Sequence, residues 1–202
     1  MPGRPLAAMQ LLMRGGAAGD PYTTNGYRGR NPYADGPEQL KWEGYDAIAQ
    51  TLDAQQFSRD HGKRGSKPYL LWLAWGPPHH PYETSPEKYQ PMYSADKIQL
   101  RPNVPPEMQK LARGWLAGYY AHCTALDDCI ADLWHTLQES GLDKNTIIVS
   151  TGDHGDMLGS HAQKRKQRPW DESARVPMLW RVPASLGVRP RRVEGTINTE
   201  DV

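Results

Sequence analysis

Residues 145–156 read NTIIVSTGDHGD, a short β-branched run that leads directly into a polar turn with glycine on both sides. β-Branched residues favour strands, so residues 145–150 predict a short buried strand. The apolar run PYLLWLAW at residues 68–75 predicts another strand, of the kind that is buried on both faces of a parallel sheet. Residues 176–182, VPMLWRV, predict a third and weaker strand. The sequence therefore indicates a sheet built from well-separated segments.

Helical patterns lie between and before these strands. Residues 45–60 are rich in helix formers, and their apolar residues recur at helical spacing: Ile48, Leu52 and Phe57. A longer helix is expected to begin near Glu107 and to stop at Ser140, where a glycine follows. Its predicted apolar stripe is Trp115, Tyr119, Cys123, Leu126, Ile130, Leu133 and Leu137. Strands alternating with helices predict an α/β sandwich, with a mostly parallel sheet flanked by helices.

Composition places the chain among globular proteins. It has 202 residues, a formal net charge of +1, and no apolar run long enough for a membrane span. Neither nucleic acid nor a membrane is therefore an expected partner. The first 44 residues are rich in turn pairs and predict an irregular Gly/Pro-rich arm before a domain at 45–202. Residues 6–13 lack the clean apolar centre of a signal peptide, which leaves the cytoplasm as the default location. The two cysteines, Cys123 and Cys129, predict small core residues in a reduced protein.

Ligands in open parallel sheets bind beyond the carboxyl ends of the strands, and two histidine-containing clusters occupy such places here. Asp153 and His154 follow one strand and could offer a carboxylate oxygen and an imidazole nitrogen to a divalent cation. On spacing alone, a solvated Asp-Gly turn is the commoner explanation. His79 and His80 follow another strand inside a proline-bracketed loop. Either imidazole could bind an anion or act as a general acid, or both could be ordinary surface histidines.

Positive charge is concentrated in the C-terminal part of the sequence. Residues 161–192 carry +7 from nine basic and two acidic residues, and the remaining residues sum to −6. Such a local field suits an anionic substrate, although a solvated surface accounts for most of the charges. The basic residues are Lys164, Arg165, Lys166, Arg168, Arg175, Arg181, Arg189, Arg191 and Arg192. Asp127 and Asp128 do not form an acid–base pair, because adjacent helix positions point about 100° apart.

Several of these segments together resemble the sulfatase family. Residues 151–161, TGDHGDMLGSH, then Lys166 and residues 170–177, WDESARVP, follow the order of the family pattern. That pattern is S/T-D-N/H-G-x-x-L-G-x-H, a lysine, and Y-E-E-S-x-R-V-P. Residues 72–82 resemble its P-H-x-P loop, and the likeness extends from Tyr45 to Val202. The resemblance implies an alkaline-phosphatase-like α/β fold and metal-dependent hydrolysis of small anionic sulfate esters.

The resemblance also assigns roles to individual residues. Asp153 and His154 fall on metal ligands, with calcium as the usual ion. A nitrogen ligand is unusual for so hard a cation, so manganese and zinc stay open. His79 falls on the sulfate-binding histidine, with His80 as the following x. Lys166, rather than its neighbour Lys164, falls on the lysine that contacts the sulfate and the leaving oxygen.

Two family features are absent from this sequence. No Cys/Ser-x-Pro/Ala-x-Arg motif, the source of the formylglycine nucleophile in the family, occurs in residues 1–202, and no early Asp-Asp pair is present. We therefore expect an incomplete fold, a central fragment of a sulfatase truncated at both ends and inactive in isolation. Two alternatives stay open. One is a phosphate or phosphonate monoester hydrolase of the same superfamily, and the other is a non-catalytic remnant or binding subunit. The oligomeric state is left open as well.

Overall fold

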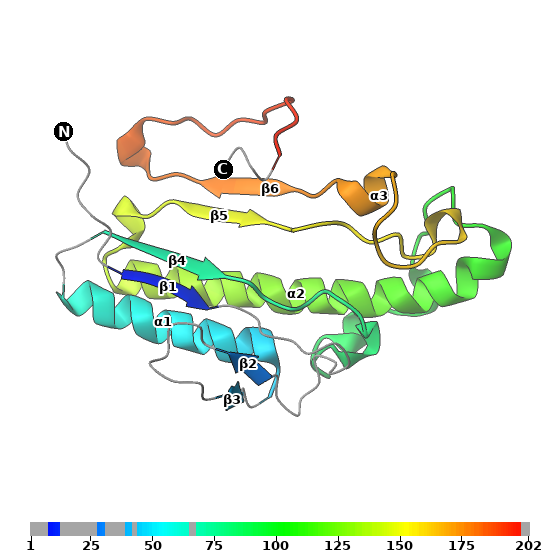
Figure 1. Cartoon of the computed structure of the whole chain (residues 1–202), viewed down its shortest axis with the longest axis horizontal. Coiled ribbons are helices and arrows are strands. Elements are labelled where there is room, and N and C mark those ends of the chain that lie inside the picture. The colour runs from blue at the N-terminus through cyan, green and yellow to red at the C-terminus, as the bar shows by residue number, and fades with distance from the viewer. Residues whose placement is uncertain (1–7, 13–27, 31–38, 42–43, 65–67, 199–202) are drawn as a thin grey trace. The chain divides into compact units, whose positions relative to one another are not determined.

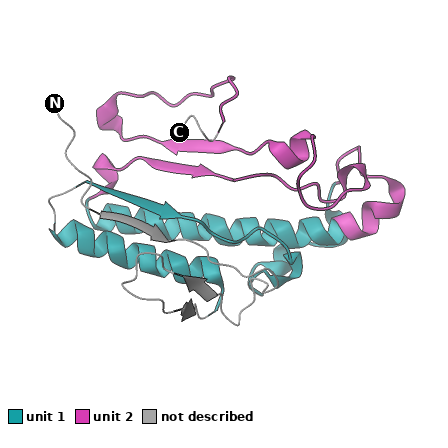
Figure 2. Cartoon of the chain, in the orientation of Figure 1, with its two compact units in different colours: residues 1–99, 113–141 teal, residues 100–112, 142–202 magenta. Residues whose placement is uncertain are grey.

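The computed structural model describes residues 8–12, 28–30, 39–41, 44–64 and 68–198 (Figure 1). The helices and strands are β1 (Ala8–Leu12), β2 (Arg28–Arg30), β3 (Gln39–Lys41), α1 (Asp46–Arg64), β4 (Tyr69–Leu73), α2 (Gln109–Glu139), β5 (Ile148–Thr151), α3 (Asp171–Ala174) and β6 (Met178–Arg181). Short 3₁₀ helices lie at Tyr82–Thr84, Gln90–Met92, Ala95–Lys97, Pro106–Met108, Asp143–Asn145, Ser160–Ala162 and Ala184–Leu186. The chain forms two compact units, residues 1–99 with 113–141 and residues 100–112 with 142–202 (Figure 2).

Strand β4 of the first unit confirms the strand predicted at residues 68–75. It pairs in parallel with β1, and Tyr69 lies opposite Ala8. The expectation that both of its faces are buried is wrong, because Leu70 is 44% and Trp72 is 58% exposed. Successive strand residues point to opposite faces, and in β4 only the alternate residues are partly covered.

The segment expected to be an irregular arm contains regular structure. Strands β1, β2 and β3 all lie within residues 1–44, and β2 pairs antiparallel with β3. The division of the chain into an arm at residues 1–44 and a domain at residues 45–202 stays a prediction. The other residues of this arm, apart from Gly44, lie outside the described part of the chain.

Helix α1 confirms the helix predicted at residues 45–60 but runs on to Arg64. Its buried face is not the apolar one that the spacing suggested, because Ile48 is 40% and Leu52 is 60% exposed. The buried side chains are small or polar: Asp46, Ala47, Gln50, Thr51, Ala54 and Ser58. Gln55 Nε2 donates to Thr136 Oγ1 of α2 at 2.9 Å. The face of α1 that carries these side chains contacts α2.

Helix α2 has the length that the sequence predicted. Its most buried positions include His122, Ala125, Cys129 and Thr136, each one residue before a member of the predicted stripe. Cys129 is a core residue as expected, whereas Cys123 is exposed, so that half of the cysteine prediction is wrong. The first unit's core cluster is Tyr45, Ala47, Tyr89, Ala121, Ala125 and Cys129. No helix among the described residues is long and apolar enough to cross a membrane.

Asp128 of α2 forms hydrogen bonds with the loop after β4. Its Oδ2 accepts hydrogen bonds from Tyr89 Oη at 2.7 Å and from Lys88 Nζ at 3.0 Å. These bonds, that of Tyr89 first, hold the pKa of Asp128 below its usual value. The carboxylate thus serves a contact between the helix and the loop after β4.

In the second unit, β5 and β6 confirm the remaining two predicted strands. They pair antiparallel, with Ile148 opposite Arg181 and Thr151 opposite Met178. The burial expected for residues 145–150 is not found, because Val149 is 39% exposed. Among the described strand pairs only β1–β4 is parallel. The turn with Asp153 and His154 begins just beyond the carboxyl end of β5.

Candidate functional site

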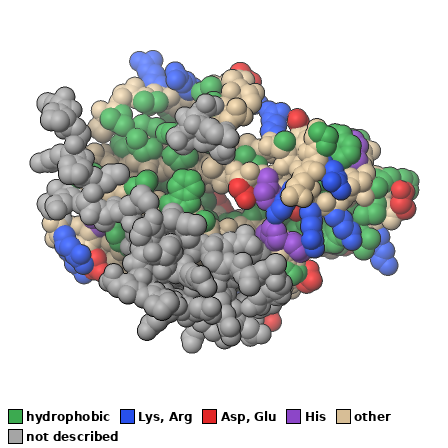
Figure 3. Space-filling model, in the orientation of Figure 1, with side chains coloured by type: hydrophobic (Ala, Val, Ile, Leu, Met, Phe, Trp, Pro, Cys, Tyr) green, Lys and Arg blue, Asp and Glu red, His purple; other side chains and the backbone are tan. Residues whose placement is uncertain are grey.

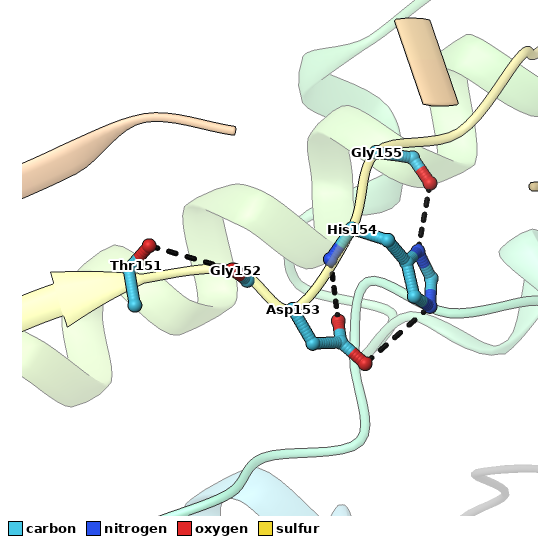
Figure 4. Close-up of polar contacts among 5 residues, drawn as sticks. All are labelled: Thr151, Gly152, Asp153, His154 and Gly155. Carbon is cyan, nitrogen blue, oxygen red and sulfur yellow. Dashed lines mark hydrogen bonds and ion pairs between the residues drawn. The ribbon is translucent and has the colours of Figure 1, made fainter. Parts of the chain in front are cut away.

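The Asp153–His154 turn brings a carboxylate and an imidazole together (Figure 4). His154 Nδ1 lies 2.8 Å from the carbonyl oxygen of Gly155, and because a carbonyl only accepts, Nδ1 carries the proton. The other ring nitrogen, Nε2, lies 3.4 Å from Asp153 Oδ2. Asp153 Oδ1 accepts a hydrogen bond from the amide of His154 at 3.0 Å, which fixes the carboxylate. The two atoms that could bind a cation, Asp153 Oδ2 and His154 Nε2, therefore point to the same side of the turn.

This pair fits a divalent cation as part of a ligand set. Because the proton is on Nδ1, the lone pair of His154 Nε2 faces the carboxylate oxygen Asp153 Oδ2. Two such acceptor atoms repel each other unless a cation or a second proton lies between them. The Asp153 side chain is 87% and the His154 side chain 32% exposed, so the pair is open to solvent. Within the described residues no three His, Cys, Asp or Glu side chains gather as a metal site. Calcium takes six to eight ligands, so Asp153 and His154 alone would not complete a calcium site.

Gly155 holds this turn against α3. Its amide donates to the carbonyl oxygen of Ser173 at 2.8 Å. A Cβ at this position would lie 2.1 Å from the carbonyl oxygen of Glu172, a distance that no side chain tolerates. The glycine of the Asp-His-Gly sequence is thus required because the backbone of α3 passes so close to it.

Lys166 lies in a loop that is tied to the same segment. The Met157 amide donates to the Arg165 carbonyl oxygen at 2.7 Å, and the Arg168 amide donates to Ser173 Oγ at 3.2 Å. These two bonds bracket Lys166 within two residues on either side. The structure therefore places Lys166 and the Asp153–His154 turn in one local scaffold of the second unit.

The surroundings of this loop are strongly basic. Lys164, Arg165 and Arg168 are exposed, whereas Lys166 is half-buried. Figure 3 shows basic side chains gathered in this part of the surface. The residues before and after Lys166 both have positive φ, 61° at Arg165 and 69° at Gln167, which is the left-handed region. Lys166 thus differs from its cationic neighbours in burial, and it lies between two residues in the left-handed region.

Two further motif residues are structural. The His161 ring stacks on Trp170, with centroids 4.5 Å apart and an interplanar angle of 12°. Asn103 Nδ2 donates to Glu172 Oε1 at 2.5 Å and lies 3.0 Å from His161 Nε2. The hydrogen bond from Asn103 is the main cause that lowers the pKa of Glu172. His161 and Glu172 therefore contribute contacts that stabilise the loop around Lys166.

His79 belongs to the first unit, in the loop after β4. Its Nδ1 donates to the carbonyl oxygen of His80 at 2.8 Å, and the two rings lie 4.2 Å apart, centroid to centroid. Both side chains are half-buried, and the Pro77–Pro78 and His80–Pro81 peptide bonds are cis. That His79 joins Asp153 and Lys166 in one site stays a prediction.

The His79 loop is seated on α2. Tyr82 is 7% exposed and packs against the rings of Trp115 and Tyr119, with centroids 6.4 Å and 6.3 Å away. A Cβ on Gly118 would lie 2.2 Å from the Tyr82 carbonyl oxygen. The helix therefore needs glycine at this position for the loop to approach it.

His122 is a residue of this support that the sequence did not single out. It is fully buried, its Nδ1 accepts from Tyr45 Oη at 2.7 Å, and its Nε2 lies 3.4 Å from the Pro81 carbonyl oxygen. Burial lowers the pKa of His122 to about 4, so the imidazole is neutral at pH 7. A single histidine inside a helical pattern carries no signal for this role.

The chain is similar to known proteins of one family. Residues 15–202 match the family model described as Sulfatase. An ulvan-active sulfatase from Formosa agariphila is 38% identical over 170 residues, covering 83% of this chain and 33% of the relative. An endo-4-O-sulfatase from Bacteroides thetaiotaomicron is 30% identical over 146 residues, covering 67% and 27%.

The same holds for solved structures. A Bacteroides fragilis protein assigned as a sulfatase has a TM-score of 0.71 at 26% identity, covering 79% of this chain and 36% of that one. The chain spans about a third of the length of these relatives. The α/β, alkaline-phosphatase-like fold class expected from the sequence is confirmed. Together, the matches show that the chain belongs to the sulfatase family.

Proposed function

We propose that this chain supplies part of a site that hydrolyses sulfate esters. In this proposal Asp153 and His154 hold a divalent cation, and Lys166 and His79 bind the sulfate. Membership of the sulfatase family supports the reaction class. The observation that carries the residue assignment is the pair of hydrogen bonds through Arg165 and Arg168, which ties the Lys166 loop to the segment carrying Asp153 and His154.

The chemistry assigned to these residues follows from charge. As an attacking oxygen forms its bond to sulfur, the bond between sulfur and the leaving oxygen breaks, and negative charge develops on the leaving oxygen. The Lys166 ammonium can offset this charge and give a proton to the departing alkoxide or phenoxide. The His79 imidazole can donate a hydrogen bond to a sulfate oxygen. A bound cation would supply further positive charge at the sulfuryl group, and we propose calcium, with manganese and zinc as the alternatives.

Cation binding tests the metal assignment. Calorimetric titrations of the chain with Ca²⁺, Mn²⁺ and Zn²⁺ should show saturable binding that falls at least about tenfold in Asp153→Asn, because a charged ligand is lost. Asp171→Asn is the matched control, since Asp171 is an exposed carboxylate of the same unit. Equal titrations for the wild type and Asp153→Asn would contradict the assignment.

Anion binding tests Lys166 and separates the two ester classes. Inorganic sulfate and inorganic phosphate are titrated against the wild type, Lys166→Ala and Lys164→Ala, with chemical shifts of backbone amides as the readout. Lys166→Ala should lose sulfate affinity, whereas Lys164→Ala makes the same change of charge two residues away and should lose little. Tighter binding of phosphate than of sulfate would favour the phosphate or phosphonate alternative.

Turnover tests the expectation that residues 1–202 lack the nucleophile. Because no Cys/Ser-x-Pro/Ala-x-Arg motif is present, the purified chain should not hydrolyse a chromogenic aryl sulfate or aryl phosphate. Turnover by the wild type that Lys166→Ala abolishes would overturn this expectation and indicate another attacking group in the chain.

A further inference from the structure

Ser173 contacts both parts of the candidate site in the second unit. It is 4% exposed and lies in the short helix α3. Its carbonyl oxygen accepts from the Gly155 amide at 2.8 Å, directly after the Asp153–His154 turn. Its hydroxyl oxygen accepts from the Arg168 amide at 3.2 Å, two residues after Lys166. One buried residue therefore connects the turn to the loop.

The hydrogen bond to the Ser173 hydroxyl holds the backbone after Lys166, and another hydrogen bond holds the backbone before it. There the Met157 amide donates to the Arg165 carbonyl oxygen at 2.7 Å. Without the Ser173 hydroxyl, the backbone after Lys166 loses its bond to α3, while the backbone before Lys166 stays tied. The lysine would then lie on a loop whose first hydrogen bond to α3 is lost, so that only the chain from Pro169 onward holds this end.

We propose that the Ser173 hydroxyl is a positioning group that sets where the Lys166 ammonium stands relative to Asp153 and His154. This inference rests on the proposed function, because it gives the hydroxyl a role only if Lys166 binds the sulfate. It also explains the serine in the segment WDESARVP, which takes no part in the assigned chemistry. Ser173 acts through Lys166 and does not touch the substrate itself.

Ser173→Ala separates the hydroxyl from the rest of the residue. Alanine favours helices and is no larger than serine, so α3 and the bond from the Gly155 amide to the residue 173 carbonyl are kept. Only the bond from the Arg168 amide is removed. Ser173→Thr keeps a hydroxyl, and Ser185→Ala removes an exposed hydroxyl elsewhere in the unit as the matched control.

Amide hydrogen exchange on the full chain gives the first readout. In Ser173→Ala the Arg168 amide should exchange about fivefold faster, the effect of losing one neutral hydrogen bond, while Gly155 changes by less than about twofold. Ser173→Thr and Ser185→Ala should leave both amides near their wild-type rates. Unchanged exchange at Arg168, or equal acceleration of both amides, would overturn the inference, because the second result indicates general loosening of the fold.

Sulfate titration in the presence of Ca²⁺ gives the second readout. Ser173→Ala should weaken sulfate binding about fivefold and leave the affinity for Ca²⁺ unchanged, and Ser173→Thr should restore the sulfate affinity. If Lys166→Ala weakens sulfate binding and Ser173→Ala does not, the inference is wrong and the proposed function stands. If Lys166→Ala also binds sulfate as the wild type does, the proposed function fails, and the positioning role fails with it.

Discussion

Replacing Gly118 with alanine should force the His79 loop away from α2. The added Cβ would lie 2.2 Å from the carbonyl oxygen of Tyr82 and 2.7 Å from its carbonyl carbon. Ordinary van der Waals contact begins at 3.4 Å, so the loop or the helix has to move by about 1 Å. The neighbour is backbone rather than the end of a flexible side chain, and a rotamer change cannot relieve the contact.

Gly114, one turn earlier in the same helix, supplies the control. A Cβ at Gly114 meets nothing within 4 Å. Both substitutions gain the helix propensity of alanine over glycine, about 1 kcal/mol, so the difference between them isolates the contact with Tyr82. Overpacking of this kind costs about 1–3 kcal/mol. We therefore expect Gly114→Ala to raise the free energy of unfolding and Gly118→Ala to lie about 2 kcal/mol below it.

Urea denaturation followed by circular dichroism at 222 nm measures both variants, because α1 and α2 dominate the helical signal. The midpoint of Gly118→Ala should fall below that of Gly114→Ala with an unchanged slope. Chemical shifts of His79 should change in Gly118→Ala only. Equal unfolding free energies for the two variants would refute the close seating of the loop on the helix.

Three further predictions concern pH, packing and charge. Burial lowers the pKa of His122 from 6.5 to about 4, so the unfolded chain binds a proton before the folded chain does as the pH falls. The free energy of unfolding should therefore decline by up to about 3 kcal/mol between pH 6.5 and pH 4. Urea unfolding at pH 7 and pH 4.5 would measure this decline, which should be smaller in His122→Gln. Gly155→Ala should lower the thermal midpoint, since its Cβ would lie 2.1 Å from a carbonyl oxygen, whereas Gly152→Ala, with a nearest contact of 3.3 Å, should lower it less. Asp128→Asn should lower the free energy of unfolding by less than about 1 kcal/mol, because the ion pair between Asp128 and Lys88 is exposed. A double-mutant cycle would measure the coupling energy between Asp128 and Lys88, and a coupling energy that 1 M salt does not reduce would contradict a charge effect.

Local signals in the sequence predicted the long helices and the strands β4, β5 and β6, but not β1, β2 or β3. Apolar runs marked β4 and β6, a β-branched run marked β5, and the glycine after Ser140 marked the end of α2. What could not be predicted is which face each helix buries. In α2 the covered positions include Ala125 and Cys129, because helix contact favours small residues over the large ones that dominate a periodic pattern.

The residues of the candidate site were likewise predictable from the sequence only in part. Asp153, His154 and Lys166 were predicted from their residue types and order, since these are side chains that could bind a metal and an anion, and their roles stay predictions. Ser173 and His122 were not, because each acts by bonding to the backbone of another segment, and such a partner has no fixed sequence spacing. The place of His79 in the site depends on the arrangement of the two units and stays a prediction.

The left-handed backbone on both sides of Lys166 affects how fast an anion would bind there. Arg165 and Gln167 each carry a side chain, so each such conformation costs about 1–2 kcal/mol and persists only because hydrogen bonds hold the backbone there. A backbone already bent in this way has little freedom left to lose when an oxyanion arrives. Capture should therefore proceed in a single fast kinetic phase, without a slow rearrangement after encounter.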